Sequence, residues 1–207
     1  MTLYLSSAYL APVVYYRNLL TEYDIYIEKF DNYIKQTYRN RCTILSANGP
    51  MPLSIPVEHQ KGEKCLMKDI CISDHGNWQH LHWNAIVSAY NSTPYFEYYC
   101  DDFRPFYERK YKFLFDFNEE FRMLICNLLD IDTSSIRYTT KYIADLSGNK
   151  DLRDIIHPKK DFKLFDPDFI SEPYYQVFGS RFGFTDNLSI IDLLFNMGTE
   201  SLIILSK

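Results

Sequence analysis

The stretch MTLYLSSAYLAPVVYYRNLLTEYDIYIEKF, residues 1–30, decides the fold class. Leu3–Leu5 has the composition of a short strand, and Val13–Leu20 predicts a helix that begins just after Pro12, a residue tolerated in a first helical turn. Isoleucines that alternate with polar neighbours then indicate a second strand, Asp24–Glu28. Strand, helix and strand in this order are typical of a parallel βαβ unit, so we expect an α/β sheet.

A β-hairpin and a helical C-terminal half are expected to follow this unit. The β-rich runs Cys42–Leu45 and Pro52–Val57 flank Asn48-Gly49, a pair typical of tight hairpin turns. The composition predicts strands over Cys65–Ser73 and Ile136–Ile143 and a loop over residues 158–172. Periodicity, capping residues and chain breakers predict five helices. These run from Trp78 to before Pro94, over Asp102–Lys112, from a capping box at Asp116 and Glu119 through Leu128, from Gly148 to His157, and over Leu188–Asn196. No linker or internal repeat divides the sequence, so one domain, residues 1–207, is expected.

The composition excludes several classes of protein. With 46% hydrophobic and 24% charged residues, the chain is neither disordered nor collagen-like. Its 22 basic and 27 acidic residues give a net charge of −5, which attracts neither nucleic acid nor an anionic membrane. The 5 cysteines lack any C-x-x-C spacing, and apolar runs are shorter than the roughly 20 residues of a membrane helix. We expect a cytoplasmic protein without disulfides that binds no nucleic acid and does not insert into membranes.

The common nucleotide and hydrolase motifs are missing from the sequence. It contains no G-x-G-x-x-G, G-x-x-x-x-G-K-[ST], H-E-x-x-H or G-x-S-x-G pattern. Only 7 glycines are present, which leaves little room for glycine-rich phosphate loops. The residues therefore specify no cofactor.

Three histidines, His75, His80 and His82, fall within eight residues. On a helix that begins at Trp78, His80 and His82 point about 200° apart, so we expect no metal ion between them. His82 shares a helical stripe with Trp78 and Leu81, and this stripe is expected to face the core. A hydrogen-bonded core histidine and a general base both fit His82.

The densest polar and aromatic segment is residues 31–41, between the second strand and the hairpin. If this segment is extended, Arg39 and Arg41 project to one face, which suits bidentate capture of a phosphate or carboxylate. Asn32 and Tyr38 are then expected to shape the binding pocket. Loops after parallel strands bind ligands in α/β proteins, but an exposed pair of salt-bridging arginines fits the pattern equally well.

The last predicted helix carries a polar strip on an otherwise apolar element. Ser189, Asp192 and Asn196 lie at positions i, i+3 and i+7. A buried carboxylate is costly unless it is paired, so Asp192 needs a partner, which one of the two arginines or the histidine could supply. A structural pairing and a catalytic one both fit. The candidate set thus adds Asp192 as a catalytic residue and Asn196 as a substrate-binding one.

Seven segments, in order along almost the whole chain, resemble the WbqC-like family of bacterial proteins. They are NYIKQTYRNRC (32–42), LSIPV (53–57), WQHLHWNAIVSAYNSTPYFEYY (78–99), DDFRPFYERKYKFLFDFN (101–118), LRDIIHPK (152–159), YYQVFGSRFGF (174–184) and NLSIIDLLFNMG (187–198). The resemblance implies an accessory enzyme of surface-polysaccharide (O-antigen) gene clusters that attaches an aminoacyl or acyl group to an amino sugar. It brings no catalytic residues with it.

The opening strand–helix–strand also resembles the nucleotidyltransferases that carry a histidine-rich HIGH-type loop. In this sequence the loop is AYLAPVVYY, residues 8–16, and it holds no histidine. The resemblance implies a Rossmann-like parallel sheet. Nucleotidyl transfer would further require a phosphate-sized hollow where the first strand meets the helix after Pro12.

Three hypotheses about function follow. In the first, a transferase acts on a sugar or sugar nucleotide, Arg39 and Arg41 hold an anionic group, and His82 or Asp192 takes the proton from an attacking amine. The second is a non-catalytic module that binds a glycan or a protein through aromatic side chains, and the third is a nucleotidyltransferase-like enzyme. Convergence of those four side chains around one hollow favours an enzyme, whereas a flat aromatic patch favours a binding module. The sequence specifies neither the donor, the acceptor nor the oligomeric state.

Overall fold

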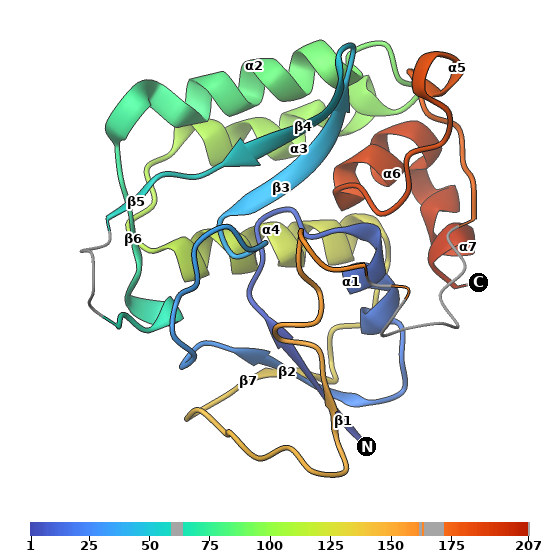
Figure 1. The fold of residues 1–207 in the computed structure, drawn as a ribbon. Coiled ribbons are helices and arrows are strands. Elements are labelled where there is room, and N and C mark those ends of the chain that lie inside the picture. The colour runs from blue at the N-terminus through green and yellow to red at the C-terminus, as the bar shows by residue number, and fades with distance from the viewer. Residues whose placement is uncertain (59–63, 162, 164–171, 207) are drawn as a thin grey trace.

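The fold is built on a parallel sheet of four strands in the order β7-β2-β1-β8 (Figure 1). The computed structural model of this chain describes residues 1–58, 64–161, 163 and 172–206. The strands of the sheet are β1 (Thr2–Ser6), β2 (Asp24–Glu28), β7 (Ile136–Tyr138) and β8 (Lys150–Asp151). The predicted α/β class with a parallel sheet is confirmed.

The strand–helix–strand unit forms where the sequence predicts it. Helix α1 (Val13–Leu19) has Pro12 as its N-cap residue and connects β1 to β2. The two strands pair in parallel, with Leu3 opposite Ile25, and both of these side chains are fully buried. Apolar residues on both strands therefore fix the register, because a slip by one residue would turn them out of the core.

The path of the chain through the sheet creates a switch point between β1 and β8. From β1 the chain passes to β2 and later to β7 on one side, and it returns to β8 on the other side of β1. The strands thus follow the order third, second, first, fourth, as at the centre of doubly wound sheets. Ligands of open α/β sheets bind outside the carboxyl ends of the strands at such a switch point.

The predicted hairpin is present, although the strand predicted after it is mostly absent. Strands β3 (Arg41–Ser46) and β4 (Gly49–Ser54) pair antiparallel around Ala47-Asn48, and Gly49 has a φ of +103° that favours glycine. The predicted strand over Cys65–Ser73 is wrong for most of its length. A 3-10 turn, Met67–Asp69, interrupts it, and only Cys71–Ile72 (β6) pairs, with β5 (Val57–Glu58).

Three long helices cover the sheet. Figure 1 shows α4 (Leu114–Leu128) between the sheet and a layer formed by α2 (Trp78–Tyr90), α3 (Phe96–Glu108) and the hairpin. The structure describes three shorter helices in the C-terminal region, which are α5 (Gly179–Phe182), α6 (Ile190–Met197) and α7 (Ser201–Leu205). Gly198, with a φ of +57°, is the C-cap residue of α6, so the predicted end of that helix is confirmed.

Two predicted helix starts are wrong because tertiary packing outweighs the local signals. Helix α3 begins at Phe96 rather than Asp102, since Phe96 and Phe103 bury one face of it. Helix α4 has Phe113 as its N-cap residue and no side-chain cap. Glu119 forms a buried ion pair with Arg122 instead of the predicted capping box.

The region after α4 departs most from the sequence prediction. Strand β7 ends at Tyr138, although the β-rich composition predicts a strand to Ile143. The predicted helix from Gly148 to His157 is wrong, because Lys150–Asp151 pairs with β1 as strand β8. The predicted loop over residues 158–172 lies mostly outside the described residues.

Aromatic side chains fill the core between the helices. The Phe106 and Phe121 rings stack with centroids 3.9 Å apart, and the Phe103 and Phe195 rings meet edge to face at 5.1 Å. Leu81 of α2, which the helical stripe places in the core, is 60% exposed, and the buried face of α2 is formed by Trp78, His82, Ile86, Ala89 and Tyr90. In the part of the chain that the structure describes, no helix has the length and apolar character needed to cross a bilayer.

Candidate functional site

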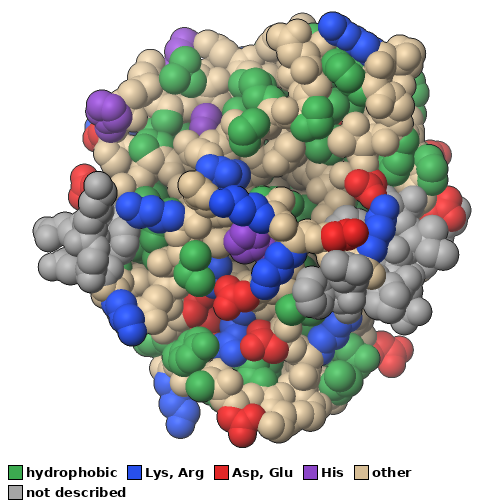
Figure 2. Space-filling view, viewed as in Figure 1, with side chains coloured by type: hydrophobic (Ala, Val, Ile, Leu, Met, Phe, Trp, Pro, Cys, Tyr) green, Lys and Arg blue, Asp and Glu red, His purple; other side chains and the backbone are tan. Residues whose placement is uncertain are grey.

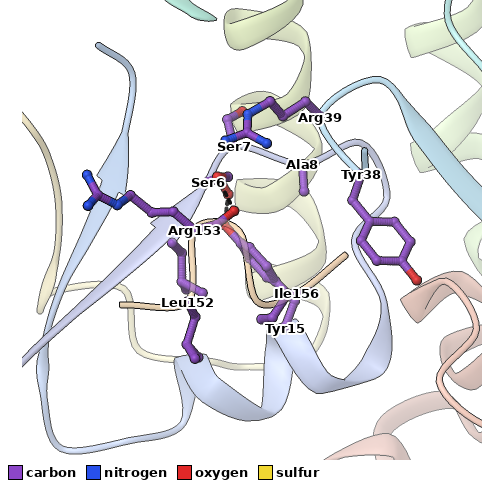
Figure 3. A pocket seen from close by; sticks show the side chains of 10 residues that line it. Ser6, Ser7, Ala8, Tyr15, Tyr38, Arg39, Leu152, Arg153 and Ile156 are labelled. Atoms are coloured by element: carbon purple, nitrogen blue, oxygen red, sulfur yellow. Dashed lines mark hydrogen bonds between the residues drawn. The ribbon is translucent and has the colours of Figure 1, made fainter. Parts of the chain in front are cut away.

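A small hollow lies where the carboxyl ends of β1 and β8 meet (Figure 3). We call it the switch-point hollow. It is lined by Leu5, Ser6, Ser7, Ala8, Tyr15, Tyr38, Arg39, Leu152, Arg153 and Ile156. Its walls thus come from the end of β1, from α1, from the segment after β2 and from the segment after β8. This position is the one that the sheet topology favours for a ligand.

Hydrogen bonds tie the two strand ends together at the floor of this hollow. The Ser6 hydroxyl donates to the carbonyl oxygen of Arg153 at 2.7 Å, as the dashed line in Figure 3 marks. The Tyr15 hydroxyl donates to the Ser6 carbonyl oxygen at 3.0 Å. Asn118 of α4 reaches the same place, since its Nδ2 donates to Ser7 Oγ at 3.3 Å and to the Arg39 carbonyl oxygen at 2.8 Å. The backbone around the hollow is therefore held from three elements.

Arg39 is the buried cation that borders the hollow. Its side chain is only 3% exposed, and its Nε and Nη2 donate to Asp31 Oδ2, Nε at 3.1 Å. Nη2 also donates to Asp154 Oδ1 at 3.2 Å. No described residue accepts a hydrogen bond from Nη1. A guanidinium that is fixed on one edge and free on another can bind an anion without first losing conformational freedom.

Arg153, in contrast, uses all of its nitrogen atoms within the protein. Nε and Nη2 donate to the Asp151 carboxylate at 2.9 and 2.7 Å, and Nη1 donates to Glu28 Oε2 at 3.0 Å. Glu28 is fully buried, and its other oxygen accepts from the Thr139 hydroxyl at 2.7 Å. This network joins the ends of β2, β7 and β8, so Arg153 is held in place by three hydrogen bonds and shapes the site.

A second hollow adjoins the first and shares Arg39 and Arg153 with it. We call it the acidic hollow, and its lining residues are Asp31, Asn32, Ile34, Arg39, Tyr142, Arg153 and Asp154. Burial raises the pKa of Asp31, although Arg39 opposes this effect. Figure 2 shows the surrounding surface, where Lys and Arg side chains gather around a histidine directly above a group of Asp and Glu side chains.

The structure brings together only part of the predicted site. Tyr38 and Arg39 line the switch-point hollow, and Asn32 lines the acidic hollow. Arg41 lies on β3, its Nε donates to Ser54 Oγ at 3.1 Å, and it lines neither hollow. The prediction that both arginines line one pocket is therefore wrong, because β3 begins at Arg41 and carries it into the hairpin.

His82 lies in the core, away from both hollows. Its Nδ1 shares a hydrogen bond of 3.1 Å with the Tyr9 hydroxyl, which in turn is 2.8 Å from the Tyr107 hydroxyl. The imidazole packs against Trp78 with centroids 5.1 Å apart. Burial lowers its pKa to about 4, so the ring is neutral at pH 7. The environment is that of a hydrogen-bonded core histidine.

Asp192 belongs to a third group, which we call the Asp192 cluster. Its carboxylate accepts hydrogen bonds from the hydroxyls of Tyr90 at 3.0 Å and Tyr174 at 2.8 Å, and from Gln176 Nε2 at 2.9 Å. Burial raises its pKa to about 6, although these three hydrogen bonds lower it. Asn196 Nδ2 donates to the backbone oxygen of Asp192 at 2.7 Å.

The predicted partners of Asp192, an arginine or His82, are therefore wrong. Two tyrosine hydroxyls and an amide satisfy the carboxylate instead. His82 and Tyr90 lie eight residues apart on α2, which is about 12 Å along the helix axis. Arg39, His82 and Asp192 thus occupy three different places, and the single convergent pocket expected from the sequence does not form.

Several residues of the site escaped the sequence analysis. Arg153 and Asp154 follow strand β8. They were missed because the sequence predicted a helix over this segment, so no strand end was expected there. Ser6 and Ser7 follow β1, where small hydroxyl residues carry no distinctive signal. The one available signal was the dense alternation of charge in LRDIIHPK, residues 152–159. In the described ranges, no group of three or more His, Cys, Asp and Glu side chains could hold a metal ion.

Comparison with known proteins gives the family of this chain. The sequence pattern of the WbqC-like protein family matches residues 7–163. The chain belongs to this family. The matched range of the WbqC-like chain contains both hollows apart from Leu5 and Ser6, and it ends before Asp192.

Known relatives add little about activity. The WbqC-like chain is similar to an uncharacterized protein of Mycobacterium tuberculosis, Rv1507c, with 27% identity over 198 residues that cover 82% of this chain and 81% of the relative. No solved structure matches the chain. The function must therefore be argued from the site.

Proposed function

We propose that this WbqC-like protein is a transferase of surface-polysaccharide biosynthesis that holds the anionic part of its substrate in the switch-point hollow. The reaction would add an aminoacyl or acyl group to an amino sugar or sugar nucleotide, as the resemblance to the WbqC-like family implies. The observation that carries the proposal is the position of Arg39. A buried guanidinium with an unused Nη1 borders a hollow at the carboxyl ends of β1 and β8.

The surroundings of Arg39 suit binding of a phosphate or carboxylate. Asp31 binds the Nε–Nη2 edge of the guanidinium, so the Nη1 edge is already oriented when a ligand arrives. Ser7 lines the same hollow, and its hydroxyl accepts a hydrogen bond from Asn118 and can donate another.

The experiment compares two arginines that lie two residues apart. Sugar nucleotides, nucleotides and acyl-coenzyme A are screened by thermal shift, and the dissociation constant of the best ligand is measured by calorimetry. Arg39→Lys keeps the charge but loses the planar fork, so we expect it to weaken binding by about tenfold or more. Arg41→Ala is the matched control, because Arg41 lines neither hollow, and it should change the constant by less than about twofold.

Two results would count against this proposal. One is that no compound of the panel shifts the melting temperature of the wild-type protein. The other is that Arg41→Ala weakens binding as much as Arg39→Lys does, while both variants keep the wild-type melting temperature.

We infer nucleotidyl transfer as a second candidate, because one observation favours it. The switch-point hollow is lined by Ser6, Ser7, Ala8 and Tyr15, which is where the first strand meets the helix after Pro12. A nucleotidyltransferase places its phosphates at this point, although the loop here lacks histidine. Release of pyrophosphate from a nucleoside triphosphate, dependent on an added acceptor, would separate this candidate from acyl transfer.

The non-catalytic binding module has less support. The aromatic segment expected to form its surface packs largely inside the protein, with Phe96, Tyr99, Phe103 and Phe106 buried. Tyr95, at 36%, and Tyr98, at 78%, are the exposed aromatic residues of this segment.

A further inference from the structure

The acidic hollow differs in charge from the switch-point hollow beside it. The carboxylates of Glu28, Asp31, Asp151 and Asp154 surround the guanidinium groups of Arg39 and Arg153. Asp31 and Asp154 line the hollow together with both guanidinium groups, and Glu28 and Asp151 add two more negative charges through their ion pairs with Arg153. Lys160 lies at the edge, where its Nζ donates to the backbone oxygen of Asp154 at 2.7 Å, and still leaves the carboxylates in excess. A cation is favoured here and a second anion is not.

The unused hydrogen-bond acceptors lie on the two carboxylates that line the acidic hollow. Asp31 Oδ1 is buried and accepts no hydrogen bond. Asp154 uses only Oδ1, and its side chain is 62% exposed. Glu28 and Asp151, by comparison, already accept hydrogen bonds from the guanidinium group of Arg153. An incoming donor group therefore meets the exposed carboxylate of Asp154, and Asp31 Oδ1 is a buried acceptor that still lacks a partner.

A primary ammonium group matches these acceptors better than a hydroxyl group does. It carries three N–H donors on one atom and one positive charge, whereas a hydroxyl group carries one donor and no charge. A buried carboxylate without enough partners is costly, and the raised pKa of Asp31 reflects that cost. An ammonium beside it would relieve the cost and hold the carboxylate in its charged form.

The two hollows are close enough for one small ligand to span them. Arg39 Nη2 donates to Asp154 Oδ1 at 3.2 Å, and Nη1 of the same guanidinium carries the free donors. An anion bound to Nη1 and an ammonium bound to Asp154 would thus lie near the two ends of the Arg39 guanidinium group.

We propose that the acidic hollow binds a primary ammonium group, with Asp154 and Asp31 as its acceptors, on a substrate whose anion lies on Arg39. This inference rests on the proposed function for its anion site and adds the residues that would hold the amine of the same substrate. Such a substrate is a suitable acceptor for an aminoacyl or acyl group, because its amine is the nucleophile once deprotonated.

Two matched probes test the assignment. O-phosphoethanolamine and propyl phosphate have the same length and differ by an ammonium group in place of a methyl group. Calorimetry at pH 7 should give O-phosphoethanolamine the lower dissociation constant by about tenfold in the wild-type protein. In Asp154→Asn the preference should fall to within about twofold, while the affinity for propyl phosphate does not fall. Asp102→Asn, an exposed carboxylate on α3, is the control and should keep the wild-type preference.

The outcomes distinguish this inference from the proposed function. Equal binding of both probes overturns the ammonium site and leaves the anion site standing. A preference that survives in Asp154→Asn overturns the assignment to the acidic hollow. Failure of both probes to bind the wild-type protein overturns the anion site, and the ammonium site falls with it.

Discussion

The acidic hollow and the Asp192 cluster each contain a buried carboxylate, but the partners of the two carboxylates among the described residues differ. At the hollow, Asp31 and Arg39 leave Oδ1 and Nη1 without a partner beside two cavities. In the Asp192 cluster, three donors satisfy the carboxylate, and the residues that line the two hollows do not include it. A buried charge alone does not identify a site. Unused donors and acceptors beside a cavity do.

The comparison predicts that Arg39 matters for both stability and binding. Arg39→Ala leaves Asp31 as a buried carboxylate without its partner, so we expect the free energy of unfolding to fall by about 3–5 kcal/mol. Urea denaturation measures this loss. Arg41→Ala, on the exposed side of the hairpin, should cost less than about 0.5 kcal/mol. A loss below about 1 kcal/mol for Arg39→Ala would show that the Arg39–Asp31 pair is not buried as described.

A second prediction concerns the pH dependence of stability that Asp192 and His82 cause. Both residues lie in the core, away from the two hollows. The folded-state pKa of Asp192 is raised to about 6, so its contribution to stability is complete below pH 4 and is lost as the pH rises through 6. The folded-state pKa of His82 is lowered to about 4, so its contribution is complete above pH 6.5 and is lost as the pH falls through 4. Each change amounts to about 3 kcal/mol across its window.

Urea denaturation between pH 4 and 7.5 checks these opposite slopes. Relative to the wild-type protein, Asp192→Asn should gain stability as the pH rises, and His82→Gln should gain stability as the pH falls. Neither variant should change the affinity for the anionic ligand at pH 7, because neither residue lines the hollows. Parallel slopes for the two variants, or loss of binding in either, would contradict the separation of core and site.

The third and smallest effect compares two buried asparagines that each donate to a backbone oxygen. Asn118 and Asn196 each donate from Nδ2 to a backbone oxygen, at 2.8 and 2.7 Å, and each has a buried Oδ1 without a partner. Replacing either by Ala should cost about 1–2 kcal/mol. Only Asn118→Ala should also weaken ligand binding, by about threefold to tenfold, since Asn118 holds Ser7 and the Arg39 backbone. Equal effects on binding would show that Asn118 has only a structural role.

The strong local patterns of the sequence predicted much of the fold. Alternation over Asp24–Glu28, Pro12 before α1, Asn48-Gly49 in the hairpin and Gly198 after α6 each act through the conformation of a few neighbouring residues. The two-residue strand β8 was missed, because pairing with β1 creates it and too few residues remain to show a pattern.

The candidate site was predicted only in part for the same reason. Arg39, Tyr38 and Asn32 follow a strand that the sequence identifies, so the topology of α/β sheets could point to them. Asp154 was missed along with β8. The partners of Asp192 could not be predicted, since Tyr90 lies 102 residues away in the sequence and meets it only through helix packing.

The central claim is that the free edge of Arg39 binds an anion in the switch-point hollow. A crystal structure of the protein soaked with propyl phosphate tests this claim most directly. The account predicts a phosphate oxygen within about 3 Å of Arg39 Nη1, with Asp31 still paired to the other edge of the guanidinium. A phosphate bound elsewhere on the protein, with the hollow filled only by water, would contradict it.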